Sequence, residues 1–227
     1  MESHGTTEIP DKMISWAQRN NQTVRGHALL WSKTHNNPPW VRTLYGEELK
    51  TAMFNRIQTT IKHFEKFNIP HWDVINEMID VGPVNHTFYI DHTGDPEIRE
   101  KVFKYAKELS PDTLLFLNDY GIILNQSGRF SLYQQQIRDL LAAGAPIDAI
   151  GLQSHIRGEL IVEVQTIKDH VDQLWEEFKL PLWVTEFDWN ALDDVDKGDH
   201  SFHASQLENF YRLMFSHEVR TLLPNSA

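Results

Sequence analysis

Residues 72–77, WDVINE, give the clearest indication of how this chain folds. It begins with apolar and β-branched residues and ends in an amide and a carboxylate, Asn76 and Glu77. The pattern returns in LWVTEFD, residues 182–188, where Glu186 follows a short apolar run. Short apolar runs that end in polar residues are typical of buried parallel strands with functional groups at their carboxyl ends.

Runs of this kind alternate along the chain with longer segments of helical period. The predicted strands are residues 24–29, 72–76, 114–118, 147–153 and 182–187. Apolar residues recur every three or four positions between them, which predicts helices. These helices cover residues 9–20, 49–64, 96–109, 130–141, 171–178 and 207–214. Alternating strands and helices require a parallel sheet covered by helices, either open or closed into a barrel.

The ends of the predicted strands favour the barrel. An open sheet of this class usually carries a glycine-rich phosphate turn after its first strand, and the sequence has no such motif. Polar groups at the carboxyl ends of several strands are instead typical of a barrel. The fold prediction is therefore α/β, of the (β/α)8 TIM-barrel type, as a single domain over residues 1–227.

Composition excludes several classes of function. The formal net charge of −11 disfavours nucleic acid as a partner, whereas a neutral polymer is indifferent to it. No apolar run approaches the roughly 18 residues of a membrane span. The chain has no cysteine, and its histidines lack the spacing of a metal site. We therefore predict no membrane partner, no metal and no cofactor.

Glu77 and Glu186 are the candidate catalytic pair. They are 186 − 77 = 109 residues apart, which places them on strands across the mouth of a barrel. Cleavage of a glycosidic bond needs one carboxylic acid and one carboxylate, and a separation of about 5–5.5 Å supports retention of configuration. The structural alternative is that each glutamate caps a helix or pairs with a lysine. Two such residues in the same position on two strands favour catalysis.

Several blocks of sequence together resemble glycoside hydrolase family 10, the endo-β-1,4-xylanases. The blocks are RGHALLW (residues 25–31) with PWV (39–41), WDVINE (72–77), NDY (118–120), IGLQSH (150–155) and WVTEFD (183–188). The resemblance covers roughly residues 10–215. It implies that Glu77 is the general acid/base and Glu186 the nucleophile. It also implies that Asn76 holds the sugar 2-hydroxyl, that His155 bonds Glu186, and that Asp188 orients His155.

The same resemblance implies a set of sugar-binding residues. His27, Trp31 and Gln153 would bind the sugar on the non-reducing side of the cut, and Tyr120 would line the cleft near the scissile bond. A structural alternative for His27 and His155 is a core histidine bonded to backbone carbonyls. The remaining tryptophans singled out are assigned to packing, namely Trp16, Trp40, Trp72, Trp175 and Trp183.

Parts of the family pattern are absent. Strands three to seven are recognisable, while the first two strands are missing and residues 215–227 offer at most a vestige of the last. Three explanations stay open: a fragment of a secreted xylanase, a half-barrel completed by a partner, or a relative that binds glycan without cleaving it. Another β-1,4-glycan is an alternative substrate. The resemblance implies secretion, although no signal peptide is visible, and a monomer unless exposed sheet edges pair.

Overall fold

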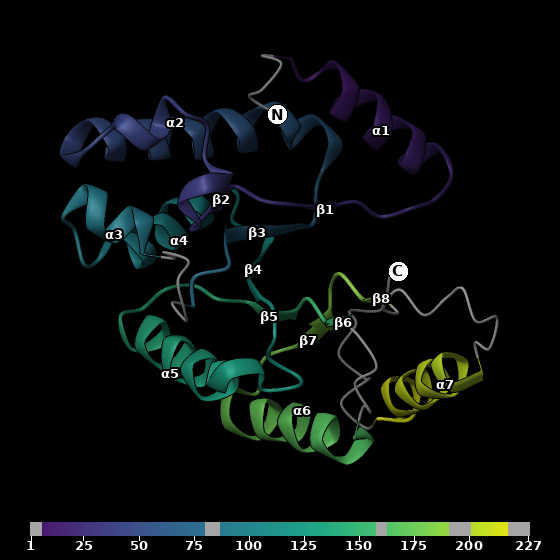
Figure 1. Cartoon of the computed structure of the whole chain (residues 1–227). Helices are drawn as coiled ribbons and strands as arrows, with labels where there is room; N and C mark the ends of the chain where they lie inside the picture. The colour runs from purple at the N-terminus through teal and green to yellow at the C-terminus, as the bar shows by residue number, and fades with distance from the viewer. Residues whose placement is uncertain (1–5, 80–86, 158–162, 191–200, 218–227) are drawn as a thin grey trace. The chain divides into compact units, whose positions relative to one another are not determined.

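The computed structural model describes residues 6–79, 87–157, 163–190 and 201–217 of the chain. Helices and strands alternate along these residues, as Figure 1 shows. They form two compact units: unit 1 contains residues 1–117 and 137–148, and unit 2 contains residues 118–136 and 149–227. The prediction of a single domain stays a prediction. Among the described residues, no helix is both long and apolar enough to cross a membrane.

Unit 1 is built around strand β3. Its elements are α1 (Glu8–Arg19), β1 (Arg25–Gly26), β2 (Leu30–Trp31), α2 (Gly46–Phe64), β3 (His71–Asn76), α3 (Phe88–Thr93), α4 (Ile98–Leu109) and most of β4 (Leu114–Asp119), with 3-10 turns at Thr34–Asn36, Val41–Thr43 and Glu65–Phe67. Both β1 and β2 pair in parallel with β3. Strand β4 lies on the other side of β3.

The apolar face of helix α2 forms part of the core of unit 1. Its buried apolar residues are Leu49, Met53, Ile57, Ile61 and Phe64. The Phe64 ring lies 6.0 Å from the Trp72 ring of β3, which joins the helix to the sheet. Helices α2, α3 and α4 contact one another in this unit (Figure 1). Each fully buried large side chain contributes about 1.5–3 kcal/mol, so this stripe fixes α2 against the strands.

Unit 2 contains the end of β4 and the remaining strands. Its elements are the 3-10 turn Gln126–Gly128, the first part of α5 (Arg129–Ala142), β5 (Ala149–Leu152), β6 (His155–Arg157), α6 (Val164–Phe178), β7 (Leu182–Val184), β8 (Asp188–Asn190) and α7 (Ser201–Ser216). Strand β5 pairs in parallel with β7, and β6 pairs in parallel with β8. Helices α6 and α7 contact each other.

The predicted elements agree with the structure where the sequence pattern is long. The strands predicted over residues 72–76 and 114–118 are confirmed as β3 and β4. Of the strand predicted over residues 24–29, only β1 at Arg25–Gly26 is present, and β2 begins just beyond the predicted range at Leu30. The strand predicted over residues 182–187 ends at Val184. Of the segment considered as a vestigial last strand, residues 218–227 lie outside the described residues.

Two tryptophans assigned to packing are exposed. Trp16 is 57% exposed and Trp40 is 53% exposed, so these two predictions are wrong. On α1 the buried position belongs to Ile14, and Trp16 lies on another face of the helix. Next to Trp40, the buried position belongs to Val41. Trp72 is buried in β3, as predicted.

Candidate active site

The candidate site residues fall into two groups. His27, Trp31, Asn76 and Glu77 belong to unit 1. Tyr120, Gln153, His155, Glu186 and Asp188 belong to unit 2. In both groups the residues lie at or just after strands that run in parallel, as the barrel prediction requires.

Glu77 lies one residue beyond β3 and has unusual surroundings. Its backbone is left-handed, with φ of 57°. Such a conformation is uncommon in a residue with a side chain and is found preferentially at functional sites. Its carboxylate is buried and forms an ion pair with the ammonium of Lys33. The structural alternative for this glutamate, pairing with a lysine, is therefore realised in the structure.

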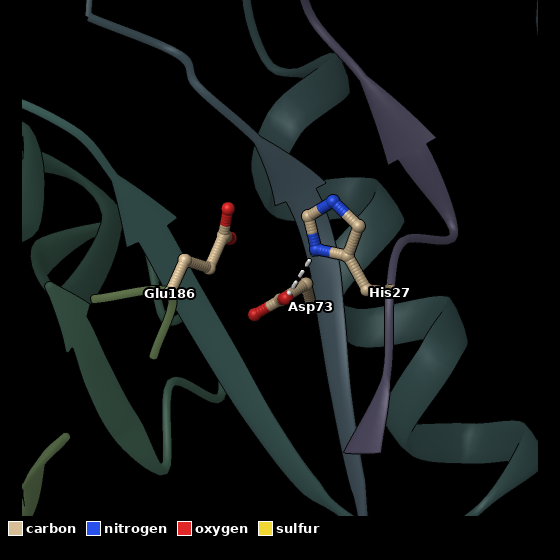
Figure 2. A group of neighbouring side chains, drawn as sticks. All are labelled: His27, Asp73 and Glu186. Carbon is tan, nitrogen blue, oxygen red and sulfur yellow. Dashed lines mark hydrogen bonds and ion pairs between the residues drawn. The ribbon is translucent and has the colours of Figure 1, made fainter. Parts of the chain in front are cut away.

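His27 is oriented by a buried carboxylate. Its Nδ1 donates to Asp73 Oδ2 at 2.8 Å, the contact drawn in Figure 2. The other Asp73 oxygen forms an ion pair with Arg25. Because an ionised carboxylate only accepts hydrogen bonds, His27 Nδ1 carries a proton and donates it to Asp73. His27 is thus held by a side-chain acid, which argues against the alternative of a core histidine bonded to backbone.

Trp31 lines a cavity of about 600 Å³ in unit 1, together with His27. The His27 and Trp31 rings meet edge to face, with centroids 5.4 Å apart. Among the described residues, the buried indole Nε1 of Trp31 has no hydrogen-bond partner. A buried donor of this kind beside a cavity is the feature that a bound hydroxyl group or water would satisfy.

Glu186 is held by an oriented amide in unit 2. Thr185 Oγ1 donates to Asn118 Oδ1 at 2.7 Å, which fixes the orientation of the carboxamide. The amide nitrogen Nδ2 then donates to Glu186 Oε1, also at 2.7 Å. The backbone N–H of Glu186 donates to the carbonyl of Gln153 at 3.2 Å, which extends the β5 to β7 pairing to this residue. Both the backbone and the side chain of Glu186 are therefore fixed.

His155 lies between two carboxylates of unit 2. Its Nε2 is 3.4 Å from Glu186 Oε2, and its Nδ1 is 3.0 Å from Asp188 Oδ2. His155 and Asp188 are register partners in the small β6 to β8 pair, which explains why they meet. These contacts have the arrangement that the family resemblance implies, with Asp188 bonded to the nitrogen away from Glu186. As for His27, the partners of the ring are acids.

Tyr120 and Gln153 lie at the ends of β4 and β5. The Arg129 guanidinium lies 3.8 Å from the centre of the Tyr120 ring, and its Nε donates to the Tyr120 carbonyl at 2.8 Å. Arg129 also forms a buried ion pair of 2.6 Å with Asp119. Gln153 is buried, and its N–H donates to the Asp119 carbonyl at 3.0 Å. A single arginine thus fixes the loop that carries Tyr120.

Comparison of the sequence with known protein families gives a match over most of the chain. The family model described as glycosyl hydrolase family 10 matches residues 6–222. The chain belongs to glycosyl hydrolase family 10.

Its similarities within family 10 are to parts of longer proteins. Endo-1,4-beta-xylanase 2 of Arabidopsis thaliana is 34% identical over 192 residues, which are 83% of this chain and 17% of that protein. Anti-sigma-I factor RsgI6 of Acetivibrio thermocellus is 30% identical over 212 residues, 93% of this chain and 25% of that protein. The chain therefore spans about a quarter or less of these curated relatives.

A solved structure confirms the fold class. The intracellular xylanase TsXylA of Thermoanaerobacterium saccharolyticum, in a complex with xylotriose, superposes with a TM-score of 0.84 at 28% identity. The match covers 97% of this chain and 70% of that one. The described strands and helices are thus part of a (β/α)8 barrel, as the sequence predicts.

Three residues of this family 10 chain escaped the sequence analysis. Lys33, Asp73 and Asn118 contact Glu77, His27 and Glu186, respectively. Asp73 and Asn118 stand inside quoted motifs, WDVINE and NDY, and a charged or amide residue within a buried strand is a signal that could have been followed. Lys33 follows a strand end in an ordinary polar loop, and nothing in its local sequence distinguishes it.

Both oxygens of Asp73 have partners, one a cation and one an imidazole N–H. A carboxylate held in this way orients the His27 ring. The prediction that the protein needs no metal stays a prediction.

Proposed function

We propose that the chain is an endo-acting, retaining glycoside hydrolase that cleaves β-1,4-xylosidic bonds in xylan. The observation that carries the proposal is the fixed carboxylate of Glu186, bonded by the Asn118 amide and approached by His155. Hydrogen bonds that orient a carboxylate hold it in the geometry that attack on an anomeric carbon needs. The names of the relatives and the xylotriose complex of TsXylA support xylan as the substrate.

The proposed reaction has two steps. Glu186 attacks the anomeric carbon while Glu77 gives its proton to the departing glycosidic oxygen, so that the C1–O bond breaks as the bond to Glu186 forms. Glu77, now ionised, takes a proton from water, and the resulting hydroxide displaces Glu186 from the same carbon. Two inversions restore the original configuration. This two-step mechanism requires the two carboxyl groups to be about 5–5.5 Å apart.

The remaining predicted residues bind and position the sugar in this proposal. Asn76 holds the 2-hydroxyl, a contact that strengthens in the transition state. His27, Trp31 and Gln153 bind the non-reducing side, and Tyr120 lines the cleft near the scissile bond. A neutral xylan chain is compatible with the net charge of −11.

The proposal is tested by incubating the purified protein with xylan and measuring new reducing ends. The matched control is Glu186→Gln, which keeps the shape of the side chain and removes its charge. Proton NMR of the first product then gives the configuration at the anomeric carbon. No reducing ends above the control, or an inverted product, overturns the proposal. A panel of xylan, cellulose and mannan decides the polymer.

A second candidate function is glycan binding without cleavage. The Lys33 ammonium on Glu77 favours it, because an acid held ionised lacks the proton that the first step needs. A relative named as an anti-sigma-I factor is also consistent with a role other than catalysis. This candidate predicts that xylo-oligosaccharides bind equally well to the wild type, Glu77→Gln and Glu186→Gln, with no reducing ends released by any of them.

We further propose that the protein acts outside the cell, where a xylan-degrading enzyme meets its polymer. The solved relative TsXylA is described as intracellular, so the family does not fix the compartment. Fractionation of the source cells with an antibody to the chain tests this proposal. Recovery of the protein in the cytosol alone refutes it.

A further inference from the structure

We propose that Lys33 is a positioning residue for Glu77, which holds the Glu77 carboxylate in its ionised form and so sets the alkaline limit of activity. The inference rests on the proposed role of Glu77 as the acid/base. The observation behind it is the ion pair between Lys33 Nζ and Glu77 Oε2, in which the side chains are 16% and 7% exposed. A lysine this deeply withdrawn from solvent differs from an ordinary surface lysine.

The sheet brings the two residues together. Trp31 of β2 is the register partner of Asn76 of β3, and the next residue, Ser32, donates its N–H to the Asn76 carbonyl at 3.0 Å. Lys33 and Glu77 therefore each follow directly on the residue that makes the last hydrogen bond between the two chain segments. Backbone pairing thus brings the two residues into range of each other.

The backbone of Lys33 is also fixed from the other side. Asn37 Nδ2 donates to the carbonyls of both Trp31 and Lys33 at 2.9 Å. The Asn37 carboxamide is itself oriented by Tyr89, whose buried hydroxyl donates to Asn37 Oδ1 at 2.7 Å. A network of buried bonds therefore fixes the residue that carries the ammonium, which is the usual support of a functional group.

The charges near the Glu77 carboxyl group determine how easily it is protonated. Lys33 acts directly on Oε2, and Arg99 of α4 donates Nη2 to the carbonyl of Met78, the next residue, at 3.1 Å. The Lys33 cation on Oε2 favours the ionised carboxylate. The Glu186 carboxylate, which the proposed reaction sets opposite, acts in the other direction. Lys33 is the nearest of these charges to Glu77 within unit 1, so its removal should make Glu77 easier to protonate.

The ionised form of Glu77 is the one that the second step of the proposed reaction uses. Glu77 begins that step as a base, whereas it begins the first step as an acid. Lys33 therefore supports breakdown of the glycosyl–enzyme intermediate and restricts its formation to more acidic pH. Its loss moves the alkaline limb of activity upward.

The experiment is a direct titration of the Glu77 carboxyl group. The full chain is labelled at the glutamate δ-carbons, followed by carbon-13 NMR from acid to neutral pH, and Glu77→Gln identifies the resonance. We expect Lys33→Met to raise the titration midpoint by about one pH unit or more, the usual effect of losing an opposite charge at this range. Lys33→Arg keeps the charge and should keep the midpoint. An unchanged midpoint in Lys33→Met overturns the inference.

A second neutral variant, Lys33→Gln, covers the case in which Lys33→Met does not fold, as judged by near-ultraviolet circular dichroism. The NMR readout needs no turnover, so absence of xylan cleavage overturns the proposed function and leaves the titration result standing. If the protein cleaves xylan, the alkaline limb of kcat/KM should move upward with the carboxyl midpoint. A midpoint that moves while the limb stays in place refutes the role of Lys33 in setting that limb.

Discussion

Glu77 of unit 1 and Glu186 of unit 2 occupy equivalent places after parallel strands, yet different chemistry holds them. Glu77 is buried against the Lys33 cation, whereas Glu186 is bonded by the neutral Asn118 amide. A neutral donor fixes the position of a carboxylate with a smaller effect on its charge state, while a cation fixes both. Two glutamates in the same sequence pattern can thus have different electrostatic surroundings, which suit them to different roles.

The same contrast appears in the acids that orient the two histidines. Asp73, the partner of His27, has a fully buried side chain and also carries Arg25. Asp188, the partner of His155, is 62% exposed. The acid that orients a histidine is therefore buried in unit 1 and exposed in unit 2. The stability of the protein should depend on these two acids very unequally.

We expect the greatest loss when Glu186 is replaced, and a substrate with a good leaving group should distinguish its role from that of Glu77. On a dinitrophenyl xylobioside, whose leaving group needs no proton, Glu186→Gln should lose about 10³-fold or more of the bond cleavage. Glu77→Gln should retain the cleavage step and stall afterwards, giving a burst of dinitrophenolate followed by slow turnover. Stopped-flow absorbance measures both. Equal losses in the two variants would contradict the division of roles.

The next effect compares the two histidine-orienting acids. Asp73→Asn should lower the free energy of unfolding by about 3–5 kcal/mol, because it leaves the partly buried charge of Arg25 without its partner. Asp188→Asn should stay within about 0.5 kcal/mol of the wild type, as is usual for an exposed position. Chemical denaturation measures both values. Similar losses in the two variants would show that burial does not distinguish these acids.

A smaller effect compares two glycines at which a neighbour approaches the backbone closely. A Cβ at Gly26 would overlap the Trp72 indole in the core of unit 1, and a Cβ at Gly151 would overlap the Asn118 carboxamide in unit 2. Both alanine variants should lose about 1–3 kcal/mol of stability. Gly151→Ala should also slow xylan cleavage, because it displaces the amide that holds Glu186. Gly26→Ala serves as the matched control, and greater damage to cleavage by Gly26→Ala contradicts the role of Asn118.

The smallest effect concerns acid sensitivity in unit 1. Burial lowers the pKa of His71 below its ordinary value of 6.5, and the nearby charge of Arg25 lowers it further. The unfolded chain therefore binds a proton first as the pH falls below about 6.5, so stability declines as the pH passes down through the folded pKa. His71→Phe should flatten the dependence of the thermal midpoint on pH between 7 and 5. An unaltered slope would remove His71 as a source of acid sensitivity.

The sequence predicted the regular elements well because burial on both faces leaves a long apolar signal. Strand β3 was located from its apolar residues Trp72, Val74 and Ile75, and helix α2 from its stripe of apolar residues every three or four positions. The strand over residues 24–29 was predicted too long, because the apolar run over residues 28–30 continues beyond the two residues of β1 that pair with β3. The β6 to β8 pair was missed because its strands, HIR and DWN, are short and contain no apolar run.

Motif residues of the candidate site could be predicted, and most of the residues that support them could not. Glu186 and His155 stand in motifs, and the structure brings them to 3.4 Å. Lys33 reaches Glu77 through strand pairing across 77 − 33 = 44 residues, which no local pattern encodes. The exposure of Trp16 and Trp40 also escaped prediction, because an apolar position in a periodic pattern does not specify what covers it.

The division of the chain into units has a consequence for synthesis. The last segment of unit 1, residues 137–148, follows a segment of unit 2, residues 118–136. Nascent domains generally fold as they leave the ribosome, the N-terminal one first. Here unit 1 cannot close until residue 148 has emerged, by which time part of unit 2 is already outside the exit tunnel. Unit 1 therefore completes its contacts only after residues 118–136 of unit 2 have been synthesised.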